Sequence, residues 1–121
     1  MKRVLVVVGL WMVVVGLIVG SSTAQAQSYP NKPIQFIIPI PAGGGGDVNA
    51  RLLIEELGKI LGQQIIPINK PGAADTVGTD LTSKSKPDGY TIGYTGSSAL
   101  IAAKILNPEN VHYDSIKDFD H

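Results

Sequence analysis

One short stretch of the chain decides the fold: Ile38-Pro39-Ile40-Pro41-Ala42-Gly43-Gly44-Gly45-Gly46-Asp47. It joins an apolar run, which predicts a β-strand, to an amphipathic run, which predicts an α-helix. Four successive glycines let the backbone turn sharply and let a ligand approach it closely, because no Cβ atom is in the way. The start of the following helix would present unpaired N–H groups and a partial positive charge. This stretch is therefore a candidate binding site for an anionic group.

On the two sides of this stretch the sequence predicts a strand over 34–38 and a helix over 47–61. The strand is almost continuously apolar, which is typical of a strand covered on both faces. Asp47 lies at the expected helix start, where its carboxylate can cap N–H groups and offset the helix dipole. Apolar residues at three- and four-residue spacing predict the buried face of the helix: Val48, Leu52, Leu53, Leu57, Ile60 and Leu61.

The rest of the chain continues this alternation of strands and helices. Pro67 indicates that the second strand lies at a sheet edge or ends early, and Asp75 or Thr76 is the expected cap of the second helix. Alternating elements predict an α/β fold with a parallel sheet. The remaining expected elements are strands over 64–69 and 90–94, helices over 75–84 and 99–106, and an irregular segment over 109–121.

Ligands of parallel α/β sheets bind beyond the carboxyl ends of the strands. Three loops are expected at that edge, over 39–46, 69–74 and 95–98, and all are rich in glycine, proline or small residues. Their coincidence favours a binding site. The simpler alternative is that the glycines form only a tight connector, and that Ser97 and Ser98 only cap the helix that follows.

The glycine stretch does not match the two common phosphate-binding motifs. A P-loop requires G-x-x-x-x-G-K-[ST], but Asp47 and Val48 follow Gly46. A dinucleotide fingerprint requires G-x-G-x-x-G, and its last position holds Val48 or Asn49. The Asp47 carboxylate would also repel a pyrophosphate. We therefore expect neither an ATPase nor a dinucleotide-dependent enzyme.

Catalytic and metal sites are not supported by the spacing of reactive residues. Ser97 and Ser98 do not lie in a G-x-S-x-G motif, so a small hydrolase is a weak alternative. His112 and His121 fall in the irregular tail, where solvated side chains are expected. No histidine and carboxylate have the spacing of helical metal ligands. The sequence predicts no enzyme and no cofactor.

The first 26 residues predict a cleaved signal peptide. Met1-Lys2-Arg3 is followed by an apolar run over 4–19 and by the cleavage motif Ala24-Gln25-Ala26. A retained anchor is the alternative, but 16 helical residues span only about 24 Å, whereas a bilayer core is about 30 Å thick. We expect Gln27 to be the first mature residue.

The amino-acid composition further narrows the class of protein to which the chain can belong. The chain has no cysteine, which excludes disulfides, a lipid-anchored cysteine and thiolate metal sites, and which fits a bacterial periplasmic protein. The formal net charge is 0, and it would become −2 without Lys2 and Arg3. This near balance, with few aromatic residues, predicts no nucleic-acid partner.

An ordered series of short motifs resembles the Bug-type solute-binding proteins, the periplasmic receptors of tripartite tricarboxylate transporters. The resemblance covers the whole mature chain, and its order makes it specific. The matching segments are Tyr29-Pro30-Asn31-Lys32-Pro33-Ile34, the stretch 38–47, Ala50-Arg51-Leu52-Leu53, Leu61-Gly62-Gln63, Asn69-Lys70-Pro71-Gly72-Ala73, Lys86-Pro87-Asp88-Gly89-Tyr90-Thr91, Tyr113-Asp114 and Lys117-Asp118-Phe119.

The resemblance implies a type II periplasmic-binding-protein fold, a Venus flytrap of two α/β domains that closes on a small carboxylate. The receptor would deliver this ligand to the membrane subunits of the transporter. In the family, main-chain N–H groups, hydroxyls and ordered waters of two loops hold the carboxylate. The residues implied here are Ile40, Ala42, Gly43, Gly44, Gly45, Gly46, Asp47, Thr95, Gly96, Ser97 and Ser98.

Some positions depart from the family pattern. Phe is usual at Ile40, Pro at Ala42, and Thr or Ser at Gly46, so an aromatic ring and a hydroxyl are missing from the expected ligand contacts. Asp75 stands where Gly or Asn is common, and its charge would weaken an anion site nearby.

Length is the largest departure, because family members have two domains. We expect residues 27–121 to be the N-terminal part of domain 1, with the second domain absent, in a fragment, a truncated product or an incomplete gene model. The alternative is an exported half-domain that binds no solute and associates through its exposed apolar surface.

Overall fold

The computed structural model describes residues 28–119. The predicted signal peptide over 1–26, the expected mature N-terminus at Gln27 and His121 lie outside the described residues. Within 28–119, no helix combines the length and the apolar character that crossing a bilayer requires.

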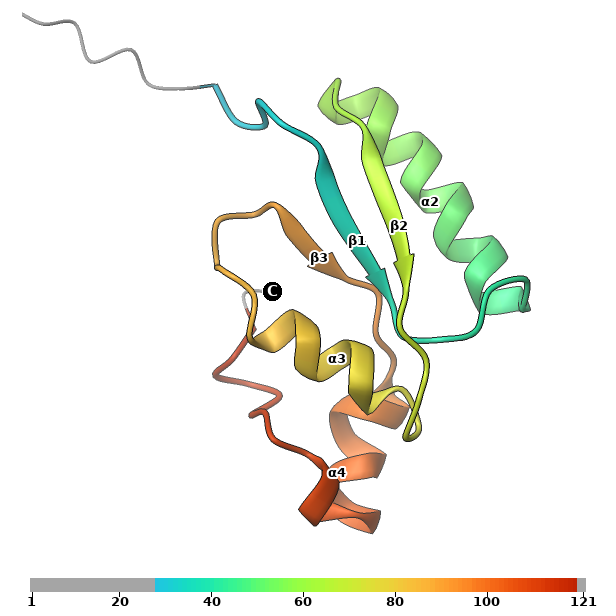
Figure 1. Ribbon diagram of the computed structural model, residues 1–121, viewed down its shortest axis with the longest axis vertical. Helices are drawn as coiled ribbons and strands as arrows, with labels where there is room; N and C mark the ends of the chain where they lie inside the picture. The colour runs from blue at the N-terminus through green and yellow to red at the C-terminus, as the bar shows by residue number, and fades with distance from the viewer. Residues whose placement is uncertain (1–27, 120–121) are drawn as a thin grey trace, which may run out of the picture.

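The described chain is an α/β fold built on a three-stranded parallel sheet in the order β2-β1-β3 (Figure 1). Ile37 in the central strand pairs with Ile68 on one side and Gly93 on the other. The predicted fold class and sheet direction are confirmed. The elements are β1 (Ile34–Ile38), α2 (Gly45–Leu61), β2 (Ile65–Asn69), α3 (Thr76–Ser83), β3 (Thr91–Gly93), a π-helical segment (Ser98–Ala102), α4 (Ala103–Leu106) and a short 3-10 turn (Pro108–Asn110).

Strand β1 is covered on both faces, as its apolar sequence predicts. Ile34, Phe36 and Ile38 are fully buried and pack against Ala50 of α2. Ile37 alternates to the opposite face of the strand, and it is buried as well. Helix α2 contacts β1 and β2, whereas α3 contacts β1 and β3. The carboxyl end of β1 is therefore held in the middle of the molecule.

The buried face of α2 differs from the predicted one. The helix packs on the sheet through Ala50, Ile54, Leu57 and Leu61. Four of the six predicted core positions are exposed instead: Val48, Leu52, Leu53 and Ile60. The helix carries apolar residues on more than one face, so the spacing of these residues is consistent with two different buried stripes. The stripe that contains Ala50 is the one that packs on the sheet. Ala50, its smallest residue, is completely buried there.

The start of α2 corrects the prediction for Asp47. The helix begins at Gly45, two residues earlier than expected, and Gly44 is its N-cap, with its carbonyl accepting from the Val48 N–H at 3.0 Å. Asp47 is the third helical residue. Its carboxylate reaches back to the chain before the helix, as an acidic residue at this position can.

Helix α3 begins very close to the chain that leaves β1. A Cβ added to Gly78 would lie 2.8 Å from Pro39 Cβ and 2.9 Å from the Lys70 carbonyl oxygen. Only a glycine permits this approach. Asp75 precedes the helix with a left-handed backbone (φ 71°), and its side chain makes no capping hydrogen bond. Asp75, one of the two predicted caps, occupies the N-cap position, but it does not cap the helix through its side chain.

The sequence-based predictions for the edge strand and the C-terminal segment are correct in part. β2, which contains Pro67, is at an edge of the described sheet, as predicted. The segment after α4 is mostly irregular, but it is not simply solvated. Tyr113 is buried, and its hydroxyl donates to the Ala99 carbonyl at 2.8 Å.

Candidate functional site

Three loops leave the carboxyl ends of the strands side by side. The Lys70 N–H donates to the Ile38 carbonyl at 2.8 Å, and the Tyr94 N–H donates to the Ile37 carbonyl at 2.8 Å. We call residues 40–46 the glycine loop. Residues 41–45 of this loop are exposed to solvent, as are Gly96, Ser97 and Ser98. The predicted site residues therefore lie at one edge of the sheet, and most of them face solvent; Ile40, Gly46 and Thr95 are half-buried and Asp47 is buried.

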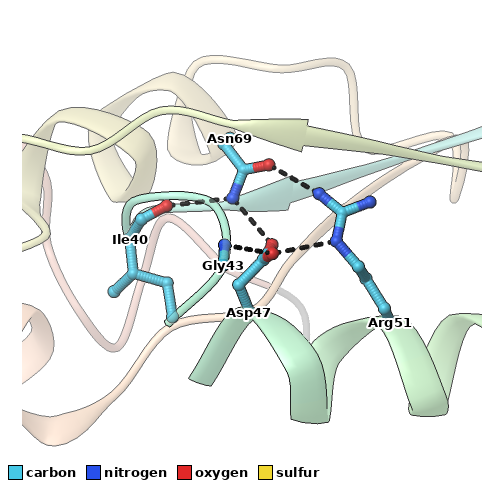
Figure 2. A network of polar contacts seen from close by, with 5 residues as sticks. All are labelled: Ile40, Gly43, Asp47, Arg51 and Asn69. Carbon is cyan, nitrogen blue, oxygen red and sulfur yellow. Dashed lines mark hydrogen bonds and ion pairs between the residues drawn. The ribbon is translucent and has the colours of Figure 1, made fainter. Parts of the chain in front are cut away.

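Asp47 is the centre of a polar network beneath the glycine loop (Figure 2). Its carboxylate is 2% exposed. One oxygen, Oδ2, accepts from the Gly43 N–H at 2.9 Å and from Arg51 Nε at 2.9 Å. The other, Oδ1, accepts from Asn69 Nδ2 at 2.8 Å. Asp47 thus points into the protein and not toward the open face of the loop.

Asn69 and Arg51 complete the network. Asn69 Nδ2 also donates to the Ile40 carbonyl at 3.0 Å, so the end of β2 is tied to the beginning of the glycine loop. Arg51 Nη2 donates to Asn69 Oδ1 at 3.0 Å. Arg51 and Asn69 were not predicted as site residues. The four-residue spacing of Asp47 and Arg51, and the position of Asn69 at a strand end, were the available signals.

The network keeps Asp47 ionised. The hydrogen bond from Arg51, followed by those from Gly43 and Asn69, holds the pKa of Asp47 far below its usual range. The guanidinium of Arg51 balances the charge, and its own pKa is raised by the same contact. The start of α2 therefore carries a matched ion pair, and the acid does not leave an unbalanced negative charge beside the loop.

The outer side of the glycine loop is open. A Cβ added to Gly45 or Gly43 would meet nothing within 4 Å. The N–H groups of the first helical turn have no carbonyl partner within the helix. The N–H of Gly43 is already donated to Asp47, so the amides that can serve an external acceptor begin at Gly44.

Ile40 covers the space above Gly46. A Cβ added to Gly46 would collide with Ile40 Cδ1. Both positions depart from the family pattern noted above, and the structure shows that they are in contact. The side chain of Ile40 occupies the volume that a larger residue at 46 would need.

The loop after β3 uses two of its three hydroxyls internally. The hydroxyls of Thr95 and Thr79 lie 2.8 Å apart. Ser98 Oγ donates to Asp75 Oδ2 at 3.0 Å, which ties this loop to the loop after β2. Within residues 28–119, Asp75 forms no ion pair with a lysine or arginine. Its negative charge is therefore unbalanced by any close described cation.

A hollow lies away from the glycine loop. It has a volume of about 790 Å³ and lies between α3, β3 and the C-terminal segment. Its lining includes Lys86, Gly93, Lys117 and Phe119, and of the predicted site residues it touches only Thr95. The sequence did not indicate this hollow.

The described residues bring together no cluster of histidines and carboxylates that could hold a metal ion. His112 is exposed, as expected of a residue in the tail. Ser98 donates to a carboxylate and not to a histidine, so the geometry shows no activated serine at this position.

Comparisons with known proteins agree on one family. The family model described as "Tripartite tricarboxylate transporter family receptor" matches residues 49–121. Protein BugT of Bordetella pertussis is 38% identical over 118 residues, which cover 98% of this chain and 35% of that protein. The chain spans about a third of the length of the curated relatives it matches.

Solved structures show the same relationship. MatC from Rhodopseudomonas palustris with bound malate is 33% identical with a TM-score of 0.70, over 75% of this chain and 31% of that one. The Rhodopseudomonas palustris protein Rpa4515 with adipate is 27% identical with a TM-score of 0.53, over 55% of this chain and 22% of that one.

Proposed function

Because the chain belongs to the tripartite tricarboxylate transporter receptor family, we propose that it acts as part of an extracytoplasmic receptor for a small carboxylate. Residues 27–121 would form the N-terminal part of domain 1, exported to the periplasm after cleavage of the 1–26 signal peptide. The receptor would pass its ligand to the membrane subunits of the transporter. The observation that carries the proposal is the open glycine loop at the start of α2.

We propose that the ligand carboxylate lies against the amides of Gly44, Gly45 and Gly46. A helix start with free N–H groups favours an anion, and the ion pair of Asp47 with Arg51 removes the repulsion that a lone acid would cause. Gly43 and Asp47 would act from beneath the loop. Ile40 and Ala42 would border the ligand, and Thr95, Gly96, Ser97 and Ser98 would approach it from the loop after β3.

The ligand class follows from the relatives. Their structures hold malate and adipate, which are dicarboxylates. Main-chain amides can bind a carboxylate group whatever carbon chain carries it. The choice among different carboxylates would therefore depend on the surrounding side chains. Asp75, with its unbalanced charge, would favour a ligand that has a hydrogen-bond donor near its carboxylate.

The alternative function is an exported half-domain that binds no solute. The observation in its favour is the exposure of large apolar side chains, with Ile105 at 73%, Leu106 at 74% and Ile116 at 82%. Such a protein would associate with another surface through these residues. We propose no catalysis and no cofactor for either function.

The test is calorimetric titration of the protein, expressed from its complete reading frame, with L-malate, adipate and citrate. We expect at least one of them to bind. The variant Gly45→Val should fold, because its Cβ has open space, but its side chain should exclude the ligand and weaken binding by about tenfold or more.

Gly58→Val is the matched control, since it places the same side chain on the same helix far from the loop. We expect it to keep the wild-type affinity. Equal affinity in the two variants would overturn the assignment of the site. An absence of binding for all three acids in the wild-type protein would favour the half-domain.

A further inference from the structure

We propose that Arg51 and Asn69 set the ligand affinity of this receptor without touching the ligand, because they fix the shape of the glycine loop through Asp47. The proposal rests on the function proposed above. It makes both residues positioning residues, which act on the loop from its inner side.

The network holds the loop at two points. Asn69 of β2 binds the Ile40 carbonyl at the beginning of the loop, and Asp47 of α2 binds the Gly43 N–H in its middle. Asn69 and Asp47 are joined to each other at 2.8 Å. The loop is thereby anchored to a strand and a helix that pack against the same central strand, and its outer face remains open (Figure 2).

A stretch of four successive glycines, two of them before α2 and two in its first turn, needs such anchors. Glycine has the largest conformational freedom of any residue, and ordering it costs the most entropy. If the loop sampled many shapes, the amides would converge on a carboxylate in only a fraction of them, and the apparent affinity would fall by that fraction. Holding the loop before the ligand arrives removes this cost.

Arg51 is suited to this role by its planar, forked side chain. Its Nε binds Asp47 while its Nη2 binds Asn69 Oδ1, and these two bonds share one rigid plane. The second bond fixes the orientation of the Asn69 amide, so that its NH₂ group faces the Ile40 carbonyl and Asp47. A lysine could balance the charge of Asp47 but could not reproduce this fork.

The experiment compares the variants Arg51→Lys and Asn69→Leu with the control Lys59→Met, each in the protein expressed from its complete reading frame. Lys59 also lies on α2 and forms ion pairs with Glu55 and Glu56, but it is remote from the loop. Two quantities are measured well below the unfolding temperature. They are the exchange rates of the backbone N–H groups over 40–46, where Pro41 has none and Gly43 donates to Asp47, by NMR without ligand, and the dissociation constants for L-malate and adipate by calorimetry.

We expect both network variants to exchange the 40–46 amides faster and to bind about tenfold more weakly. Lys59→Met should match the wild type in both measurements. If the network only stabilised the fold, the folded variants would keep the wild-type affinity, and that result would overturn the proposal. Arg51→Lys keeps the charge and allows the test even if Asn69→Leu does not fold.

The two readouts separate this proposal from the proposed function. Unchanged amide exchange in both network variants would overturn the positioning role, whatever the wild-type protein binds. Failure of the wild-type protein to bind any of the acids would instead overturn the proposed function, and with it the effect on affinity. In that case, faster amide exchange in the network variants would still establish that Arg51 and Asn69 anchor the glycine loop.

Discussion

The charge of Asp47 links the stability of the fold to the shape of the candidate site. Its carboxylate is buried, accepts three hydrogen bonds from Gly43, Arg51 and Asn69, and has a pKa far below its usual range. A carboxyl whose pKa is lowered in the folded state binds its proton more readily in the unfolded state. Its contribution to stability is therefore complete above the ordinary pKa of 3.8 and is lost as the pH falls toward the lowered value.

Asp47→Asn should therefore reduce stability most at neutral pH. We expect the urea midpoint of the variant to lie below that of the wild type at about pH 7, and the difference to shrink below about pH 4, where the Asp47 carboxyl of the unfolded wild-type chain takes up a proton while that of the folded protein stays ionised. Urea unfolding followed by circular dichroism across this range measures the effect. The pKa of Asp114 is also lowered, but Asp114 is present in both proteins and its effect cancels. Parallel midpoint curves at all pH values would show that Asp47 is not the group responsible.

Among the elements, the close approach of α3 to the chain after β1 brings the loops of the site together. Pro39, Lys70 and Gly78 meet at this point, and two of the three atoms nearest to an added Gly78 Cβ, the Lys70 carbonyl oxygen and Pro39 Cα, belong to the backbone. Backbone atoms cannot move aside as the end of a flexible side chain can. The start of α3, and with it Asp75, is therefore placed by the absence of a side chain at Gly78.

Gly78→Ala should lower the unfolding free energy by about 1–3 kcal/mol, because the helix must shift to admit one methyl group. Gly58→Ala is the matched control within α2. Its Cβ would lie 3.4 Å from the Gln63 carbonyl oxygen, and relief from the entropy of glycine should stabilise the protein by about 0.5–1 kcal/mol. Denaturant unfolding measures both. An unchanged or increased stability in Gly78→Ala would show that the contact is not tight.

The sequence predicted the elements better than their inner faces. The apolar run over 34–38 and the glycine stretch predict β1 and the loop, and they place the helix start to within two residues, because each depends on neighbouring residues alone. The buried stripe of α2 was missed because Ala50 adds little hydrophobicity to a pattern, yet its small size lets the helix lie close to the sheet. Asn69 joins the site through a contact with Asp47, 22 residues away in sequence, and local patterns do not show such contacts.

For the whole molecule, the described residues would give one side of the proposed binding site. The sheet and its two flanking helices place the three loops at one edge (Figure 1), and the chain spans about a third of the length of its curated relatives. The exposed large apolar residues include those of α4 and the C-terminal segment, whereas the apolar residues of β1 are buried. We propose that a carboxylate binds at the glycine loop and not in the hollow beside β3.

Titration of the ¹⁵N-labelled protein with L-malate, followed by amide chemical shifts, tests this claim most directly. We expect the largest changes at Gly44, Gly45 and Gly46, with smaller changes at Ser97 and Ser98. Changes centred on Lys86, Lys117 and Phe119, or no change at any malate concentration, would contradict it.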